Sequence, residues 1–225
     1  MAILLHNLQV RSPKLKDAGD VAELLMACDV VEEGVSDYKE EDVLSGWQTA
    51  WQRSCFNLEK DAWVIVTLKG LLVGYADVRV SRDAQIELRM HVHPDYRGRG
   101  IGTFLLRLAE ERARQHARQL DSSARVTLQS AVKQTNRTAR QLLEHEGYLP
   151  VQHFWRLTLK TDEPSHGSSH PGKVTFDLCI DGQPAADVLN SHQRTGIYAA
   201  CQYHLYEKEL QPGELALPAE MMANA

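Results

Sequence analysis

The most constraining feature of this sequence is a strand-like segment that leads directly into a glycine-rich loop. Residues 86–93 alternate between apolar and polar side chains, which predicts a half-buried β-strand. Pro94 ends the alternation, and the loop sequence DYRGRGIGTF occupies residues 95–104. Apolar residues then recur at helical spacing from Ile101 to Ala109. The loop is therefore predicted to join a strand to the N-terminus of a helix.

The composition of this loop is typical of an anion-binding turn. Gly98, Gly100 and Gly102 would let backbone N–H groups approach an anion without obstruction by Cβ atoms. The helix N-terminus adds donors that have no intrahelical acceptor, and Arg97 and Arg99 add positive charge. The pattern predicts a phosphate-binding loop. The alternative is a tight turn and helix cap with two incidental arginines.

Two common phosphate-binding loops do not fit the segment. A Walker loop requires GxxxxGK[ST], and the sequence contains no Gly-Lys-Ser or Gly-Lys-Thr. A dinucleotide fingerprint requires GxGxxG and an acidic residue that closes a following strand about twenty positions on; the loop has Gly98-x-Gly100-x-Gly102, and no acidic residue closes such a strand. A P-loop nucleoside triphosphatase is thus excluded, and the pattern argues against a dinucleotide-binding domain.

Composition restricts the partners and the compartment. The formal net charge of -5 argues against nucleic acid and against an anionic membrane as partners. No apolar run approaches the roughly 18–20 residues of a membrane span, and the N-terminus does not resemble a secretory signal. The cysteines (Cys28, Cys55, Cys179 and Cys201) form no CxxC pair, which is typical of reduced thiols. We therefore expect a cytoplasmic protein. No metal site is expected either, because His166 and His170 have no further ligands at metal-binding spacing.

Periodicity predicts an alternation of strands and helices along residues 1–160. A strand is expected at 8–11, a helix within 16–34 capped by Asp20, and a helix at 40–53. A hairpin is expected to turn at Lys69-Gly70. After the loop and its helix, a strand is expected at 124–132, a helix at 136–147 and a strand at 148–160. In the last strand, Pro150 favours an edge position or a bulge.

The composition changes after residue 160. Residues 161–172 are rich in Pro, Gly, Ser and His, and are predicted to be a linker. Residues 173–225 contain strand-like stretches but are too short to build an independent core comfortably. We predict one domain at 1–160, followed by this linker and by a C-terminal extension that docks on the domain or on a partner subunit.

The loop resembles the acyl-CoA-binding signature of the GNAT N-acetyltransferase superfamily, [RQ]-x-x-G-x-[GA]. Residues 136–148 are similar to the second block of that family, N-x-x-A-x-x-L-Y-x-x-x-G-[FY]. The predicted order of elements across residues 1 to about 160 matches the family as well. The matching residues are Arg97, Gly100 and Gly102 in the first block, and Asn136, Ala139, Leu142, Gly147 and Tyr148 in the second.

The resemblance implies a fold and an origin for the tail. The fold is the α/β GNAT acyl-CoA N-acyltransferase fold, with a mixed central sheet flanked by helices and a short β-rich C-terminal extension. The segment YEKEL at 206–210 is similar to the closing strand of a second copy in tandem-GNAT proteins. On that hypothesis the tail is a remnant that completes a sheet or mediates a homodimer.

The resemblance also implies a reaction. An acetyl group would move from acetyl-CoA to a primary amine, on a small molecule or a peptide, by direct attack. The pyrophosphate would lie on the amides of 98–103, and the pantetheine arm would pair with 90–92, splayed from the fifth strand near 127–130. The alternative is a non-catalytic acyl-CoA-binding or regulatory domain. The implied cofactor-binding residues are Met90, His91, Val92, Arg97, Gly98, Arg99, Gly100, Ile101, Gly102, Thr103 and Asn136.

The catalytic assignments leave alternatives open. Glu87 is the best candidate for the base that deprotonates the amine, or it pairs with Arg79 or Arg89 on the sheet surface. His91 is a second candidate base or a structural histidine. Leu143 occupies the position of the tyrosine that often protonates the departing thiolate, so that step would rely on water.

The acidic stretch at 29–42 is a further open assignment. It includes Glu32, Glu33, Asp37 and Tyr38. It would favour a cationic amine in an acceptor pocket, or it is a solvated loop.

Overall fold

The structure is a computed structural model that describes residues 7–34, 36, 38–53, 56–81, 85–120, 124–164, 171–178 and 197–212. The chain forms two compact units. The first contains the described residues up to Gln129 together with 208–212, and the second is Ser130–Glu207. Each unit is described by itself.

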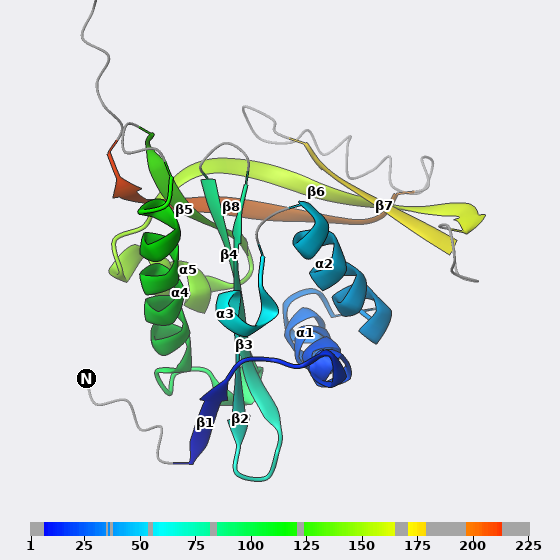
Figure 1. The fold of residues 1–225 in the computed structure, drawn as a ribbon. Coiled ribbons are helices and arrows are strands. Elements are labelled where there is room, and N and C mark those ends of the chain that lie inside the picture. The colour runs from blue at the N-terminus through cyan, green and yellow to red at the C-terminus, as the bar shows by residue number, and fades with distance from the viewer. Residues whose placement is uncertain are drawn as a thin grey trace, which may run out of the picture. The chain divides into compact units, whose positions relative to one another are not determined.

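The first unit is built on a mixed sheet (Figure 1). Its first strands are antiparallel neighbours in chain order, and the next is parallel to the last of them. The strands are β1 (Leu8–Arg11), β2 (Ala62–Thr67), β3 (Leu72–Val80), β4 (Gln85–Val92) and the beginning of β5 (Val126–Lys133). The predicted hairpin between β2 and β3 is confirmed, and Gly70 supplies its positive φ of 85°.

Helices cover both faces of this sheet; the three longer ones lie where helices were predicted, and a four-residue helix at 58–61 was not predicted. They are α1 (Ala18–Glu33), α2 (Glu40–Arg53), α3 (Leu58–Asp61) and α4 (Ile101–Ala117), with 3₁₀ turns η1 (Leu15–Asp17) and η2 (Pro94–Tyr96). In Figure 1, α4 lies on one side of β3 and β4, and α1 and α2 lie on the other.

The close packing of α4 depends on a glycine in β3. A Cβ atom at Gly74 would lie 3.1 Å from Ile101 and 3.3 Å from Leu105, so glycine lets the helix approach the sheet. The next residue along β3, Tyr75, points to the opposite face, where its hydroxyl contacts Trp47 of α2. Alternation along β3 thus separates a face for α4 from a face for α1 and α2.

The predicted cap of α1 is wrong. The helix begins at Ala18, so Asp20 lies within its first turn, and the N-cap residue is Asp17. The carboxylate of Asp17 does not cap α1; it pairs with Arg11 at 2.7 Å and accepts from the backbone N–H of Lys14 at 2.6 Å. The short η1 turn upstream therefore sets where α1 begins.

The described residues of the second unit form the end of β5, one helix and three strands. They are α5 (Arg137–His145), β6 (Leu149–Pro164), β7 (Pro171–Leu178) and β8 (Ile197–Gln211), with strand order β8-β6-β7. The predicted start and end of this helix are confirmed. Asn136 is its N-cap, and Gly147, with φ of 86°, follows its end. The register between β6 and β8 shifts between Pro150 and Gln152, in agreement with the expected bulge.

The described parts of the predicted linker at 161–172 are strand and not loop. β6 continues to Pro164, β7 begins at Pro171, and Thr161 pairs with Gly172. Antiparallel pairing here prevails over local composition. His166 and His170 lie outside the described residues, as do Cys55 and Cys179, and the domain boundaries drawn near this segment stay a prediction.

The tail belongs to the same sheet as the strands before it. β8 pairs antiparallel with β6 from Leu149↔Glu207 to Leu159↔Ile197. In the first unit, Lys208 pairs with Glu110 at 2.8 Å and Glu209 pairs with Arg125 at 2.9 Å. The described part of the tail therefore contributes the strand β8, and its origin as a remnant of a second copy stays a prediction.

Within the described part of the chain, no helix is both long enough and apolar enough to cross a membrane.

Candidate functional site

The loop predicted to bind phosphate presents a run of backbone donors. Gly98 and Gly100 have φ of 75° and 84°, in the left-handed region that favours glycine. Gly100 is the N-cap of α4, and its carbonyl accepts the first helical hydrogen bond, from Phe104 at 3.0 Å. In the described part of the chain, no N–H group of residues 98–103 donates to a backbone carbonyl. The loop therefore offers consecutive N–H groups at a helix N-terminus.

The two arginines of the loop have protein partners. Arg97 donates to the carboxylate of Glu32 at 2.8 Å and to the carbonyl of Val92 at 3.3 Å. Arg99 lies over the ring of Tyr96, 4.7 Å from its centroid, and donates to a backbone carbonyl. Arg97 thus fastens the loop to α1 and to the end of β4. A contact from either arginine to a phosphate stays a prediction.

The strand before the loop is paired with β5 only over its first residues. Gln85, Ile86 and Glu87 pair with Thr127, Leu128 and Gln129, and no described ladder joins residues 88–92 to β5. Those residues pair with β3 as far as Val92↔Gly74. The expected splay near 127–130 is thus corrected: 127–129 are hydrogen-bonded to β4, and the pairing stops after them.

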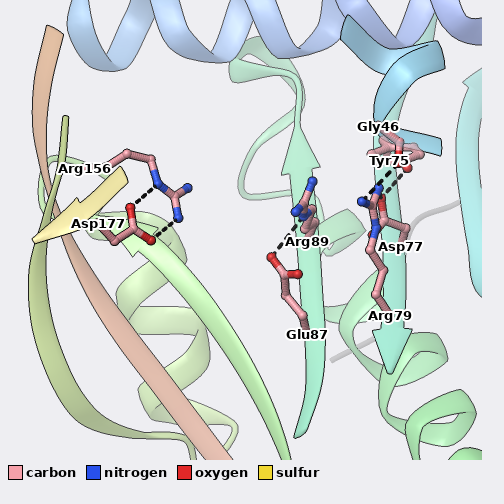
Figure 2. A network of polar contacts seen from close by, with 8 residues as sticks. All are labelled: Gly46, Tyr75, Asp77, Arg79, Glu87, Arg89, Arg156 and Asp177. Carbon is pink, nitrogen blue, oxygen red and sulfur yellow. Dashed lines mark hydrogen bonds and ion pairs between the residues drawn. The ribbon is translucent and has the colours of Figure 1, made fainter. Parts of the chain in front are cut away.

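Glu87 resolves one open alternative. Its carboxylate accepts from Arg89 at 3.0 Å, and the two side chains are 48% and 44% exposed (Figure 2). The partner is therefore Arg89 and not Arg79. The role of Glu87 as a base stays a prediction.

A buried polar network on the same face of the sheet was not anticipated from the sequence. Trp47 donates to the hydroxyl of Tyr75 at 2.8 Å, and that hydroxyl donates to Asp77. Arg79 donates to both oxygens of Asp77 at 2.9 and 3.1 Å and to the carbonyl of Gly46 at 3.3 Å (Figure 2). The network ties β3 to α2. Its signal was present in the spacing of Tyr75, Asp77 and Arg79 on one face of an otherwise apolar strand.

The electrostatics of this network keep Tyr75 protonated. Burial, and then the charge of Asp77, raise the pKa of Tyr75 well above its ordinary value. The phenol is therefore a donor, and Asp77 is held as the acceptor. Asp77 is 1% exposed, so it positions its neighbours and does not face solvent.

The remaining predicted residues of β4 lie at the end of the strand. His91 is opposite Tyr75 in the ladder, on the same face as Glu87 and Arg89, and Met90 is opposite Ala76. The carbonyl of Val92 accepts from Arg97 and, at 3.4 Å, from the thiol of Cys28. Burial raises the pKa of Cys28 to about 11, so this group is a thiol donor at neutral pH.

With this geometry described, the chain can be compared with known proteins. The sequence profile of the acetyltransferase (GNAT) family matches residues 20–148, more than half of the chain. The chain belongs to the GNAT acetyltransferase family. The matched range includes β4, the loop and α4 of the GNAT domain.

Solved structures share the GNAT fold with this chain. A GCN5-related N-acetyltransferase from Sphaerobacter thermophilus has a TM-score of 0.74 at 19% identity, covering 92% of this chain and 96% of that one. The protein yncA of Salmonella typhimurium, solved with its cofactor acetyl-CoA, has a TM-score of 0.55 at 14% identity, covering 94% and 98%. A phosphinothricin acetyltransferase from Sinorhizobium meliloti, in complex with acetyl-CoA, has a TM-score of 0.55 at 16% identity, covering 95% and 94%. A comparison with curated protein sequences finds no significant match.

The second GNAT block lies in the second unit. The side-chain oxygen of Asn136 accepts from the N–H of Ala139 at 3.0 Å, so Asn136 caps α5, and its contact with a cofactor stays a prediction. Leu143, in place of the family's tyrosine, is 1% exposed. Tyr148 is also 1% exposed, whereas the side chain of His145 is 84% exposed and lies 3.7 Å from Glu146.

Proposed function

We propose that this GNAT protein transfers the acetyl group of acetyl-CoA to a primary amine by direct attack. One observation carries the proposal: in the described part of the chain, the N–H groups of residues 98–103 donate to no backbone carbonyl. Two of these residues, Gly98 and Gly100, are glycines with positive φ. These residues resemble the acyl-CoA signature of the GNAT family and lie within the range that the family profile matches. A pyrophosphate is the group whose charge and acceptor oxygens suit such a loop.

The short ladder between β4 and β5 supports a place for the pantetheine arm. The pairing with β5 ends at Glu87, and β4 continues to Val92. An extended chain with amide groups binds such an edge as an added strand would. The arm would therefore lie along residues 90–92. The cofactor would run from its pyrophosphate on the loop to its thioester beside this edge of β4.

The reaction needs one proton removed before bond formation. Glu87 accepts a proton from the ammonium group of the acceptor, and the freed amine attacks the thioester carbonyl. A C–N bond forms as the C–S bond breaks, and CoA leaves as a thiolate that water protonates. A backbone N–H near the end of β4 would polarise the carbonyl during attack.

One observation favours a second candidate function. Leu143 carries no proton donor where the family often has a tyrosine, and it is buried. A domain that binds acyl-CoA without turnover would tolerate this residue. Because thiolate is a tolerable leaving group near neutral pH, with a thiol pKa near 8.5, we favour transfer over binding alone.

The test is release of CoA thiol from acetyl-CoA with a panel of amines. We expect release that depends on the amine, and a loss of about 10²- to 10⁴-fold in the Glu87→Gln variant. Glu111→Gln is the control, because Glu111 is a 57% exposed carboxylate on α4 that also lies near an arginine. The control should retain full activity.

Each other outcome has a distinct meaning. Binding of acetyl-CoA without release for any amine supports the non-catalytic candidate. Absence of binding contradicts both candidates. Release that is insensitive to Glu87→Gln contradicts only the assignment of the base.

A further inference from the structure

An open pair of opposite charges lies on the sheet face next to the proposed thioester position. Glu87 and Arg89 are both nearly half exposed and are joined by one contact of 3.0 Å, from Nε of Arg89. The terminal nitrogens of Arg89 make no hydrogen bond in the described part of the chain. An exposed ion pair of this kind contributes little to folding stability. Opening it to admit a ligand is therefore inexpensive.

The neighbouring charges on the same face are already committed. In the ladder, Arg79 is opposite Glu87 and Asp77 is opposite Arg89. Arg79 and Asp77 are joined by two hydrogen bonds, and their side chains are 14% and 1% exposed, respectively. Among the described residues of this face, Arg89 and Glu87 form an exposed ion pair on β4, and the Asp77–Arg79 pair lies beside it on β3 (Figure 2).

We propose that the acceptor is a small zwitterionic amine of the α-amino acid class. Its carboxylate binds the terminal nitrogens of Arg89, and its ammonium group binds Glu87, which also takes up the proton. This inference rests on the proposed function, because Glu87 and Arg89 directly precede residues 90–92, where the acetyl-bearing arm is proposed to lie.

The spacing of the two side chains suits such a ligand. Residues two apart on a strand point to the same face and lie roughly 7 Å apart. The ammonium and carboxylate of an α-amino acid are attached to one carbon, so a single small molecule can meet both side chains. The planar guanidinium can then bind the carboxylate with two parallel hydrogen bonds.

Other amines fit the pair less well. A simple amine draws Glu87 toward itself and leaves Arg89 without the carboxylate that accepts its described hydrogen bond. A polyamine brings a second cation close to Arg89, and a peptide N-terminus offers no adjacent carboxylate. Only the zwitterion supplies a counter-charge to both members of the pair.

The test compares acceptors that differ only in the carboxylate. For leucine, leucinamide and 3-methylbutylamine, and for matched sets with other side chains, kcat/KM for acetylation is measured with acetyl-CoA. We expect at least one amino acid to exceed its amide and its decarboxylated amine by about 10- to 100-fold. Arg89→Gln should remove that preference by lowering kcat/KM for the amino acid, and Arg89→Lys should restore part of it.

A matched control and the contrary outcomes keep the two proposals apart. Arg125→Gln breaks a similarly exposed ion pair, Arg125–Glu209 at 2.9 Å, and should leave the preference unchanged. Equal kcat/KM for the three acceptor types, or a preference that survives Arg89→Gln, overturns the zwitterion proposal and leaves the transferase intact. No acetylation of any acceptor overturns the proposed function itself.

Discussion

Replacing Gly98 by alanine separates the binding role of the loop from its folding role. Gly98 has φ of 75°, and apart from Gly98 and its two chain neighbours no described residue has an atom within 4 Å of the position that a Cβ would occupy. Alanine there meets only backbone strain, of about 1–2 kcal/mol. For a chain of this size that strain lowers Tm by about 2–8 °C. Gly70, in the β2–β3 hairpin, has φ of 85° and equally open surroundings, so Gly70→Ala should cost the same.

The two variants should differ once acetyl-CoA is added. At about 100 times Kd, the cofactor stabilises the wild type by about 2.7 kcal/mol. If the Cβ at position 98 costs one charge-assisted hydrogen bond, Kd rises about 10- to 100-fold. The same cofactor concentration then stabilises Gly98→Ala by only about 0.4–1.4 kcal/mol. Thermal unfolding with and without acetyl-CoA measures this difference.

The comparison with Gly70→Ala decides the outcome. Gly70→Ala should keep the full stabilisation by acetyl-CoA, because its loop has no proposed contact with the cofactor. Equal stabilisation of Gly98→Ala and Gly70→Ala would refute the placement of the pyrophosphate on residues 98–103.

Three further predictions concern groups that position the site or hold the fold. Glu32→Gln removes the charge partner of Arg97 and should lower the free energy of unfolding by about 1–3 kcal/mol and weaken acetyl-CoA binding; urea unfolding and calorimetric titration measure the two effects. Asp61 is fully buried and pairs with Arg112 at 2.6 Å and His116 at 2.9 Å. Burial acts to raise the pKa of Asp61, but the bonds from His116 and Arg112 outweigh it and hold that pKa below 3.8. Asp61→Asn should therefore cost about 3–5 kcal/mol at pH 7, and the difference from wild type should shrink as the pH falls below 3.8; a pH-independent difference would contradict this. Burial and a hydrogen bond to Glu144 raise the pKa of Tyr206 to about 12, so its contribution is complete below pH 10 and lost as the pH rises toward 12. Tyr206→Phe should cost about 1 kcal/mol at neutral pH and should not show that loss, as measured by unfolding at a series of alkaline pH values.

Local signals were sufficient for much of the first unit. The alternation along β4 and the glycine-rich entry to α4 are patterns of a few residues each, and the structure has both where they were expected. The hairpin at Gly70 needs a positive φ, which local sequence indicates as well. These elements depend on backbone preferences and on the burial of one face. Both properties can be predicted from residues that are close together in the sequence.

The missed features depend on partners that are distant in the sequence. Arg97 is bonded to Glu32, 65 residues away, and this contact cannot be inferred from the loop alone. The strand character of 161–164 comes from pairing with β7, although the stretch 161–172 is rich in Pro, Gly, Ser and His. The early start of α1 has the same kind of cause, because Asp17 is fixed by Arg11 before the helix begins.

The most direct test of the central claim follows the acetyl group itself. Acetyl-CoA labelled with ¹³C at the carbonyl is incubated with the protein and an amino acid acceptor, and the label is followed by NMR. The proposed transferase predicts loss of the thioester signal with an equal gain of an N-acetyl amide signal, only when protein and amine are both present. A thioester signal that persists across the acceptor panel, or a label that appears only as free acetate, would contradict acetyl transfer to an amine.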